Sequence, residues 1–379
     1  MTSLRLQVPP PRNKYLVIGG YGVVGRVVCE YLGAKFPGRV VAAGRNMHAA
    51  SAFASSSSGS VSPRRIDVSD PATLDASLND AHVVITCVNA RNRESAEACI
   101  RQRAHFVDIS ASYSVLRSLD VLNDQARASG VTGVLSVGLS PGITNLLVRH
   151  VHDVLGAVGS AEITVLLGLG DTHGRDAILW MLENSRAALG EAAPIQLPEP
   201  YGTRAAYALD FADQHVVRHT LGIEHARTRL CLEPAYMTRA LALLSSSGAL
   251  ALLGRVGALE PLARLLSAVR FGSDAFVAQV EAHGDDGTAR ALVCGLKEAR
   301  ITGLVASLVA ESLGTTSPLP GVRHIEENFE LKYFASTLEE FGCAVTWART
   351  PSDLSARQSS RRGEGRQRMS TREDRSLNG

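Results

Sequence analysis

The sequence predicts an α/β protein in which a Rossmann-type, doubly wound parallel sheet carries an inserted α+β domain. Three observations support this fold class. A short apolar strand, Tyr15–Ile18, runs into the spacing Gly20-x-Gly22-x-x-Gly25. Strand-like and helix-like segments then alternate as far as residue 140. Beyond Pro141 the rhythm changes, and hairpin punctuation indicates a mixed or antiparallel sheet.

Each glycine of the first motif has a physical task. Gly20 allows a tight turn, Gly22 lets the backbone approach a pyrophosphate, and Gly25 lets the following helix pack closely on the strand. The pyrophosphate would lie on the unpaired N–H groups and the positive dipole end of that helix, Val23–Leu32. A glycine-rich turn without a ligand is the alternative. The strand before the motif and the helix after it favour the nucleotide.

The second strand, Arg39–Ala43, indicates which cofactor binds. An NAD site usually carries an acid about 20 residues past the glycines, where it accepts from the ribose 2′-OH. This chain has no acid between Glu30 and Asp67, and Arg45 follows the strand instead. A guanidinium pairs well with a 2′-phosphate, so we expect NADP. An exposed arginine without a ligand is the alternative.

The remaining strands of the first domain follow in order. Ala81–Val88 is a near-continuous apolar run, as expected of a parallel strand covered on both faces. We expect Ser51–Ser62, which is rich in serine, to be a mobile insertion. We expect a helix that is N-capped by Ser69 or Asp70 and has Pro71 in its first turn. The other predicted segments, which complete a sheet of order 3-2-1-4-5-6, are strands Arg65–Val68, His105–Ile109 and Val131–Val137 and helices Glu94–Gln102 and Val115–Ala128.

The second domain is predicted from less regular signals. Its expected elements are strands Ala161–Leu167, Thr228–Leu232, Ala275–Ala282 and Thr288–Leu296, a helix near Arg175–Ala188, and a hairpin turn at His283–Gly287. The apolar run Ala240–Gly254 predicts a buried helix, with a subunit interface or a membrane-surface contact as alternatives. After the linker Ser317–Gly321, an amphipathic helix at Glu326–Phe341 is expected to return to the first domain.

These signals divide the chain into five parts. We expect an N-terminal extension (1–13), a Rossmann domain (14–150), a substrate and dimerisation domain (151–318), a returning C-terminal helix (319–348) and a disordered basic tail (349–379). The tail from Pro351 holds seven arginines against four acids and has no aromatic residue.

Composition narrows the function classes. The formal charge of +2 gives no case for a nucleic-acid partner, and the six cysteines form neither C-x-x-C nor a zinc-type spacing, so no metal is expected. The N-terminus lacks the apolar core of a secretory signal. The longest apolar run is too short and broken to span a bilayer. We therefore expect a cytoplasmic protein with a small-molecule substrate and no membrane partner.

Three segments of the first domain resemble a known family. They are Val83–Val88, Val107–Tyr113 and Gly138–Leu147, the last with the turn Gly-Leu-Ser-Pro-Gly. They resemble the NADP-dependent, glutamate-forming saccharopine dehydrogenases, specifically over residues 14–150 and more loosely afterwards. The resemblance implies a Rossmann domain interrupted by a substrate and dimerisation domain, a possible homodimer, and hydride transfer between nicotinamide C4 and a carbon doubly bonded to nitrogen.

The segment Gly168–Asp176 and the helix with Trp180 depart from the lysine-pathway enzymes. They are closer to bacterial saccharopine-dehydrogenase-like proteins, so the cofactor and the hydride chemistry should carry over, whereas lysine metabolism should not be assumed.

Three residues are candidates for catalysis. Asp108 ends the fifth strand, where it would hold an ammonium group or relay a proton, or else bond nearby turn amides. In the loop after residue 167, His173 would donate a proton and Arg175 would bind a substrate carboxylate; ordinary surface polarity is the alternative.

The expected cofactor contacts lie at the carboxyl edge of the sheet. Asn89 would bond a cofactor hydroxyl or amide, or else cap a helix, and Pro141-Gly142 would offer backbone N–H groups near the nicotinamide. The full predicted set is Gly20, Tyr21, Gly22, Val23, Val24, Gly25, Arg45, Asp67, Cys87, Val88, Asn89, Pro141 and Gly142.

The sequence therefore predicts an NADP-dependent oxidoreductase acting on an imine or secondary amine of an amino-acid-derived substrate. Two alternatives remain: a ketone or activated-alkene reductase of a specialised pathway, and a non-catalytic NADP-binding protein.

Overall fold

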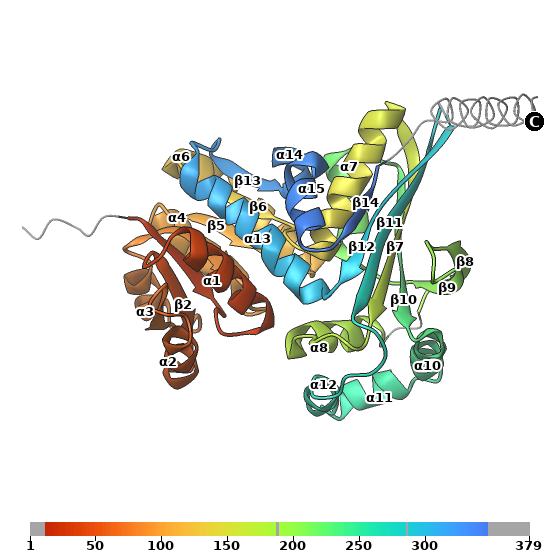
Figure 1. Cartoon of the computed structure of the whole chain (residues 1–379), viewed down its shortest axis with the longest axis horizontal. Helices are drawn as coiled ribbons and strands as arrows, with labels where there is room; N and C mark the ends of the chain where they lie inside the picture. Colours follow the sequence, from red (N-terminus) through yellow and green to blue (C-terminus); the bar gives the residue numbers. More distant parts are fainter. Residues whose placement is uncertain (1–11, 187–188, 286, 348–379) are drawn as a thin grey trace, which may run out of the picture.

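The computed structural model describes residues 12–186, 189–285 and 287–347 (Figure 1). Most of the predicted N-terminal extension, the expected helix end at Ala188 and the predicted tail at 349–379 lie outside these residues.

The first domain is built on a seven-stranded sheet in which every pair of neighbours is parallel. Its order, β13-β6-β5-β4-β1-β2-β3, contains the predicted 3-2-1-4-5-6 arrangement and confirms the fold class. The chain adds β13 at one edge after passing through most of the second domain. The strands are β1 (Lys14–Ile18), β2 (Val40–Gly44), β3 (Val61–Arg65), β4 (Ala81–Thr86), β5 (His105–Asp108), β6 (Thr132–Leu135) and β13 (Gly321–His324).

Helices cover both faces of this sheet, because alternate residues of each buried strand point in opposite directions. In β1, Tyr15 and Val17 face the core under α1, α2 and α13, whereas Leu16 and Ile18 face the core under α3 to α6. The helices are α1 (Val23–Lys35), α2 (Met47–Ser55), α3 (Pro71–Ser77), α4 (Asn92–Arg101), α5 (Tyr113–Asp120), α6 (Asn123–Ser129) and α13 (Glu298–Thr315).

Three local predictions for this domain are wrong. The serine-rich segment is no mobile insertion, because Asn46 accepts a hydrogen bond from Ala49 N–H, Phe53 is buried, and the resulting helix α2 leads into β3. Strand β3 consequently lies at Val61–Arg65 instead of Arg65–Val68. The single helix expected at 115–128 is two, α5 and α6, and the break between them allows Leu122 to be buried.

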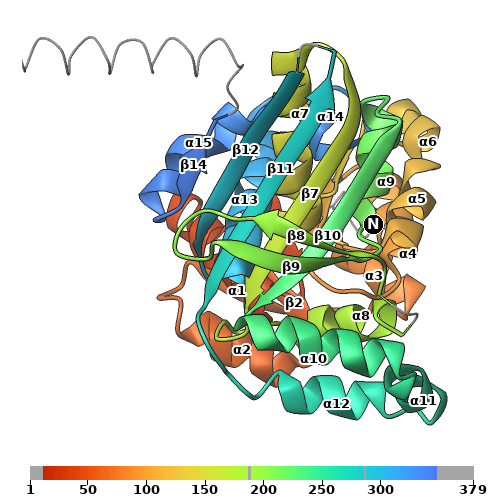
Figure 2. The ribbon, with the colours of Figure 1, turned by 90° about the vertical axis from the view of Figure 1, so that its right-hand side faces the viewer.

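The second domain is built on a mixed sheet of order β14-β12-β11-β7-β10-β9-β8, seen face-on in Figure 2. Only β7 and β10 pair in parallel. The predicted hairpin is confirmed, with Gly284 opposite Gly287; β8, β9 and β14 were not predicted. The strands are β7 (Val158–Gly168), β8 (Ala192–Gln196), β9 (Thr203–Ala208), β10 (His225–Glu233), β11 (Ala275–Gly284), β12 (Gly287–Leu296) and β14 (Ala344–Thr346).

The remaining helices of the described chain have different supports. Helix α7 packs on β11 and β12, while α10, α11 and α12 share an apolar cluster with α8. They are α7 (Thr144–Leu155), α8 (Arg175–Asn184), α9 (Ala212–Thr220), α10 (Ala235–Ser246), α11 (Ala249–Arg255), α12 (Leu259–Leu266), α14 (Ile325–Asn328) and α15 (Leu331–Glu340).

Two helix predictions for this part of the chain are corrected. The apolar run Ala240–Gly254 is divided between α10 and α11, which are bent by 62° at a break, and its Leu243 and Leu252 are exposed instead of buried. The helix expected at 326–341 is two, α14 and α15. Among the described residues no single helix is long and apolar enough to cross a membrane, although the bent pair α10–α11 meets that length and composition together.

Helix α13 joins the two domains. In Figure 1 it runs diagonally across the Rossmann half towards the second sheet. Its buried face belongs to an apolar core that includes residues of both sheets, such as Val17 of β1 and Phe276 of β11. Gly303 allows α13 to lie against α1, because a Cβ there would come within 2.7 Å of Val27 Cβ.

This contact gives a stability prediction. Gly303→Ala should lower the free energy of unfolding by about 1–3 kcal/mol, because the added methyl group overpacks the α1–α13 interface. Gly159→Ala is the matched control, since no atom lies within 4 Å of the Cβ position there. Urea unfolding of both variants checks the expectation, and equal stabilities would show that the two helices adjust without cost.

Candidate functional site

The glycine loop between β1 and α1 has two structural glycines and one that faces solvent. A Cβ at Gly20 would lie 2.7 Å from Ala42 Cα, and one at Gly25 would lie 2.2 Å from the Gly19 carbonyl oxygen. Gly22 is exposed and is the N-cap of α1, where no side-chain hydrogen bond caps the helix. The first turn of α1, with Val23 and Val24, is therefore open to an external acceptor.

Two arginines lie at the ends of β2 and β3. The register places Gly44 opposite Arg65, and Arg45 follows Gly44 directly. Both guanidinium groups are exposed and have no ion-pair partner among the described residues. Arg45 was predicted from the sequence. Arg65 was missed, because only the strand register shows that it shares this edge.

Tyr21 shapes the same edge. Its hydroxyl oxygen accepts a hydrogen bond from Asn46 N–H at 3.0 Å, and its ring leaves no space for a Cβ at Gly44. Asp67, two residues past β3, accepts from Ser69 N–H at 3.0 Å and so turns the chain into α3. The structure thus brings Tyr21 and Arg45 together and gives Asp67 a local partner.

The segment after β4 lies against the glycine loop. A Cβ at Gly19 would meet Val88 at 2.8 Å and the Cys87 carbonyl oxygen at 3.0 Å. Burial, and to a lesser extent the Asp108 charge, raises the pKa of Cys87 to about 12, so its thiol stays protonated. Asn89 accepts a hydrogen bond from the Ser110 hydroxyl at 3.3 Å. The alternative in which Asn89 caps a helix is wrong, because the N-cap of α4 is Arg91.

Asp108 is a buried carboxyl group at the end of β5. It accepts hydrogen bonds from the Asn92 side chain at 2.7 Å and from Ser110 N–H at 2.8 Å, which are the turn contacts considered as an alternative to a catalytic role. Burial raises its pKa to about 6, against the opposing effect of these two donors. Through Ser110 the carboxyl group also fixes the position of Asn89.

The Gly-Leu-Ser-Pro-Gly motif forms a sharp turn between β6 and α7. Gly142 adopts a φ of 141°, which side chains rarely tolerate, and its N–H donates to Asn145 Oδ1 at 3.1 Å. Leu139 N–H donates to the Thr302 hydroxyl at 3.1 Å. The expectation that Pro141-Gly142 offers backbone N–H groups to the nicotinamide is therefore wrong, because Pro141 has no N–H and is buried, and the Gly142 N–H is already bonded within the turn.

Buried carboxylates from outside the first domain hold this turn. Asp213 of α9 accepts from the Ser140 hydroxyl at 2.7 Å and the Thr228 hydroxyl at 2.6 Å. Glu326 of α14 accepts from Asn145 at 3.1 Å and from Thr220 at 2.7 Å. Burial raises the pKa of both groups. Neither residue was predicted, because each reaches the turn from a distant part of the sequence without a motif.

His173 is linked to the same turn through α13. Its Nε2 lies 2.9 Å from the Gly168 carbonyl oxygen and its Nδ1 lies 3.8 Å from Glu298 Oε2. Glu298 accepts in turn from the Thr302 hydroxyl, at 2.9 Å. Burial lowers the pKa of His173, but the contacts with Glu298 and the Gly168 carbonyl outweigh it and leave the pKa above its ordinary value.

Arg175, by contrast, points its guanidinium group at acidic neighbours. It pairs with Asp176 at 2.8 Å and with Glu260 of α12 at 3.0 Å, and all three side chains are well exposed. The structure joins Arg175 neither to Asp108 nor to the turn at Pro141 by any contact among the described residues.

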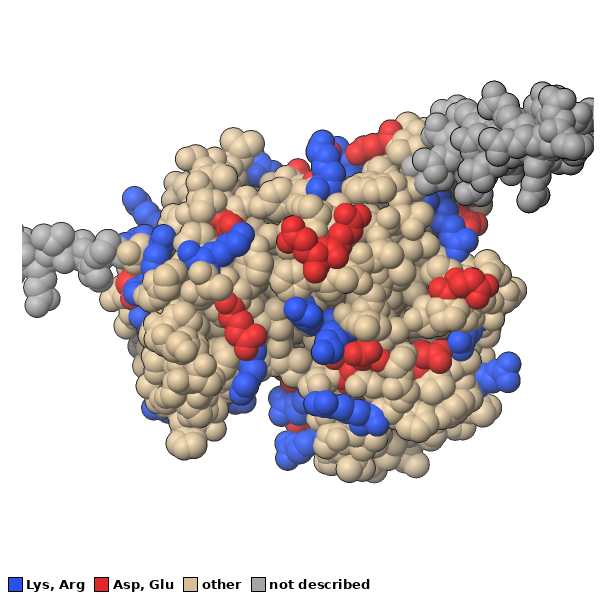
Figure 3. Space-filling model, viewed as in Figure 1, with Lys and Arg blue, Asp and Glu red and all other residues tan. Residues whose placement is uncertain are grey.

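A groove of about 700 Å³ runs between the Rossmann domain and α8. Its cationic side chains are Arg93 of α4, which pairs with Glu97, and Arg117 of α5, which has no ion-pair partner among the described residues. Trp180 of α8, the helix that departs from the lysine-pathway enzymes, also lines this groove. The full lining is Arg93, Ala111, Ser112, Tyr113, Ser114, Arg117, Ser118, Val121, Trp180, Glu183, Asn184 and Asp210. On the face in Figure 3, the molecule is also hollowed between the two domains, with blue cationic side chains near the rim.

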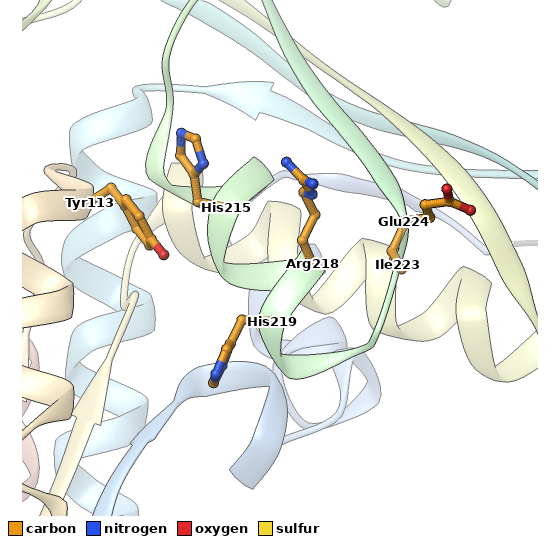
Figure 4. Close-up of a pocket in the computed structure, with 6 residues that line it drawn as sticks. All are labelled: Tyr113, His215, Arg218, His219, Ile223 and Glu224. Atoms are coloured by element: carbon orange, nitrogen blue, oxygen red, sulfur yellow. The ribbon is translucent and has the colours of Figure 1, made fainter.

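A smaller hollow of about 400 Å³ beside α9 does not form a convergent site. Tyr113 stacks on His215 with ring centroids 4.5 Å apart, but Figure 4 shows His219 pointing to the opposite side of α9 from His215 and Arg218. In the described parts of the chain, no group of three or more His, Cys, Asp or Glu side chains gathers to hold a metal.

Comparisons with known proteins fit this geometry. The saccharopine dehydrogenase NADP binding domain family matches residues 15–134. No curated protein matches the sequence. Among solved structures, apo saccharopine dehydrogenase (L-Glu forming) from Saccharomyces cerevisiae aligns with a TM-score of 0.63 and 17% identity over 89% of this chain and 99% of that chain. DAP dehydrogenase from C. glutamicum aligns with a TM-score of 0.44 and 15% identity over 86% and 99%, too weakly to support an argument.

The matched residues contain the glycine loop, both edge arginines and Asp108, and they end before the turn at Pro141 and the loop of His173. The yeast enzyme shares the two-domain fold. Residues 15–134 thus match the NADP-binding domain of the saccharopine dehydrogenase family.

Proposed function

We propose that this protein is an NADP-dependent oxidoreductase that transfers hydride to or from a C=N carbon of an amino-acid-derived substrate. The observation that carries the proposal is the pair Arg45 and Arg65, two exposed cations at the ends of β2 and β3 that form no ion pair within the described part of the chain. An NAD site would need an acid there for the ribose 2′-OH. The membership of residues 15–134 in an NADP-binding family supports the same cofactor.

The residues at the carboxyl edge fit this dinucleotide. Gly22 and the uncapped first turn of α1 would hold the pyrophosphate, and Arg45 and Arg65 would hold the 2′-phosphate. Val88 and Asn89 would border the nicotinamide, because they follow β4 and lie beside the glycine loop. The bound cofactor supplies the hydride, and the protein orients it towards the crevice.

The substrate would enter the groove between α5 and α8. Arg117 would bind its carboxylate, and Glu183 or Asp210, which line the same groove, would face its ammonium group. His173 is our proposed proton donor, since its contacts with Glu298 and the Gly168 carbonyl raise its pKa and so favour the protonated ring. Donation requires Nε2 to exchange the Gly168 carbonyl for the substrate.

One assay separates this proposal from the two alternatives. Oxidation of NADPH, followed at 340 nm with pairs of amino acids and oxo acids, supports imine chemistry. Turnover with ketones or activated alkenes alone supports a different reductase. Tight NADPH binding without turnover on any of these classes supports a binding protein.

Cofactor choice is tested by Arg45→Asp. The new carboxylate repels the 2′-phosphate and suits a 2′-OH, so the Kd for NADPH should rise at least tenfold while the Kd for NADH stays equal or falls. The exposed Arg218 on α9 supplies the control Arg218→Asp, which should leave both constants unchanged. Equal losses for NADPH and NADH in fluorescence titrations would rule out the assignment.

The substrate arginine is tested by comparing Arg117→Gln with Arg175→Ala. Losing a charge-assisted pair with a carboxylate costs about 2 kcal/mol or more, which lowers kcat/KM for the substrate roughly 30-fold. We expect this loss for Arg117→Gln, with NADPH affinity unchanged. The same loss confined to Arg175→Ala would move the substrate from the groove to the loop after β7.

Asp108 gives a pH prediction. Its pKa is raised to about 6, so the folded protein binds this proton more tightly than the unfolded chain, and ionisation of Asp108 destabilises the fold. Its contribution to the free energy of unfolding should fall as pH rises from about 4 to about 6 and stay low above that. Wild type should therefore lose about 1 kcal/mol relative to Asp108→Asn between about pH 5 and pH 8. Urea unfolding at the two pH values measures this difference. If the free energies of unfolding of wild type and Asp108→Asn change by the same amount between them, the raised pKa is contradicted.

A further inference from the structure

The three helices α10 to α12 and the segment up to Phe271 carry an unusual amount of exposed apolar surface. We call residues 235–271 the helical platform. Leu243 is 69% exposed, Leu252 61% and Leu265 64%. Large hydrophobic side chains this exposed are common singly but not in such a cluster. The exposed set on the platform is Tyr236, Leu243, Leu244, Leu252, Val256, Leu265, Leu266, Val269 and Phe271.

The exposed leucines are not needed for the fold of the platform. Its inner, buried face is formed by Leu241, Leu250 and Leu259, which pack against Ile178 and Leu182 of α8. The two ends of the platform are joined on the outside by Tyr236 and Phe271, whose ring centroids lie 6.1 Å apart. Figure 2 shows α10 and α12 at one end of the second domain, beyond the sheet. The platform is therefore amphipathic, with a second apolar face turned outward.

The platform also carries an excess of positive charge. It carries four exposed arginines (Arg239, Arg255, Arg264 and Arg270) and a single acid, Glu260. That acid is already paired with Arg264 and with Arg175 of α8. On α10, Tyr236, Arg239 and Leu243 are spaced by three and four residues and so share one helical face. The outward surface thus combines apolar side chains with uncompensated positive charge.

We infer that the helical platform docks on an anionic lipid surface. Leucine and aromatic side chains beside arginines, on helices that lie in one layer, match the requirements of an interfacial membrane contact. Phosphate and carboxylate headgroups provide the negative charge that the platform lacks. This inference departs from the expectation, drawn from the sequence, that the protein has no membrane partner.

A second copy of the chain suits the platform less well. A two-fold interface brings the same patch onto itself, so the four arginines of each copy would be gathered in one interface. The one acid available to balance them is already occupied. A bilayer also accommodates the bend of 62° between α10 and α11, because helices lying in the headgroup layer need not form a continuous span.

The experiment is vesicle flotation of the full chain. Vesicles of phosphatidylcholine with phosphatidylserine should carry the protein, and vesicles of phosphatidylcholine alone should carry much less. The variant Leu243→Ser/Leu252→Ser should weaken binding at least tenfold through lost apolar insertion. The variant Arg239→Gln/Arg270→Gln should weaken it roughly 25-fold, about fivefold for each arginine near an anionic surface.

Matched controls separate the platform from the rest of the chain. Leu319→Ser removes a leucine that is 74% exposed in the loop before β13, and Arg218→Gln removes an exposed arginine of α9. Neither should change flotation, and melting curves verify that every variant is folded. The residues beyond 347 are identical in all variants, so their contribution cancels.

Two results would overturn the inference. Platform and control variants that float equally well would show that the lipid contact lies elsewhere. A chain that ignores anionic vesicles but elutes as a dimer, which the platform variants dissociate, would show that the surface is an interface between copies.

Discussion

Helix α13 is packed into the apolar core shared by both sheets, and the site depends on this contact. Its N-terminal residues receive the loop of His173 through Glu298 and the turn of Leu139 through Thr302. The next residue, Gly303, fits against α1, the helix that follows the glycine loop. A shift of α13 would therefore move three parts of the crevice together: the glycine loop, the Pro141 turn and the loop after β7. The cofactor side and the substrate side share one rigid support.

The sequence predicted what is decided locally. Three features follow from residues that are close together in the sequence: the glycine spacing, Arg45 and the strand order of the first domain. They depend on backbone geometry and on the alternation of strands and helices over short distances. Arg65 was missed because its place at the cofactor edge follows from strand register and not from a motif. Asp213 and Glu326 were missed because they reach the Ser140–Asn145 segment from positions 73 and 181 residues away.

The apolar run Ala240–Gly254 shows a different limit. Its composition indicates helices, but composition does not tell which face another element covers. Here α8 covers one face only, so Leu241 and Leu250 are buried while Leu243 and Leu252 are exposed. The serine-rich segment after β2 is the converse case. Polar composition suggested mobility, yet one N-cap and a buried phenylalanine were enough to fix a helix.

Three buried carboxyl groups, Asp108, Asp213 and Glu326, surround the crevice, and burial raises the pKa of each. Each is also held by hydroxyl or amide donors that favour the ionised form. Burial and hydrogen bonding act in opposite directions on all three, so each carboxyl group is costly to bury and costly to leave without its donors. These three carboxyl groups specify one arrangement of the turn and the β5 loop, because any other arrangement would leave a buried acid without hydrogen-bond donors.

Helix α8 has two different neighbours on its two sides. Ile178 and Leu182 pack on the helical platform, while Trp180, Glu183 and Asn184 line the groove beside the Rossmann domain. These two sets of contacts lie within ten residues of one helix, Arg175–Asn184. The helical platform and the groove thus share one supporting helix, and Trp180 takes part in both, because it also packs against the apolar cluster of the platform.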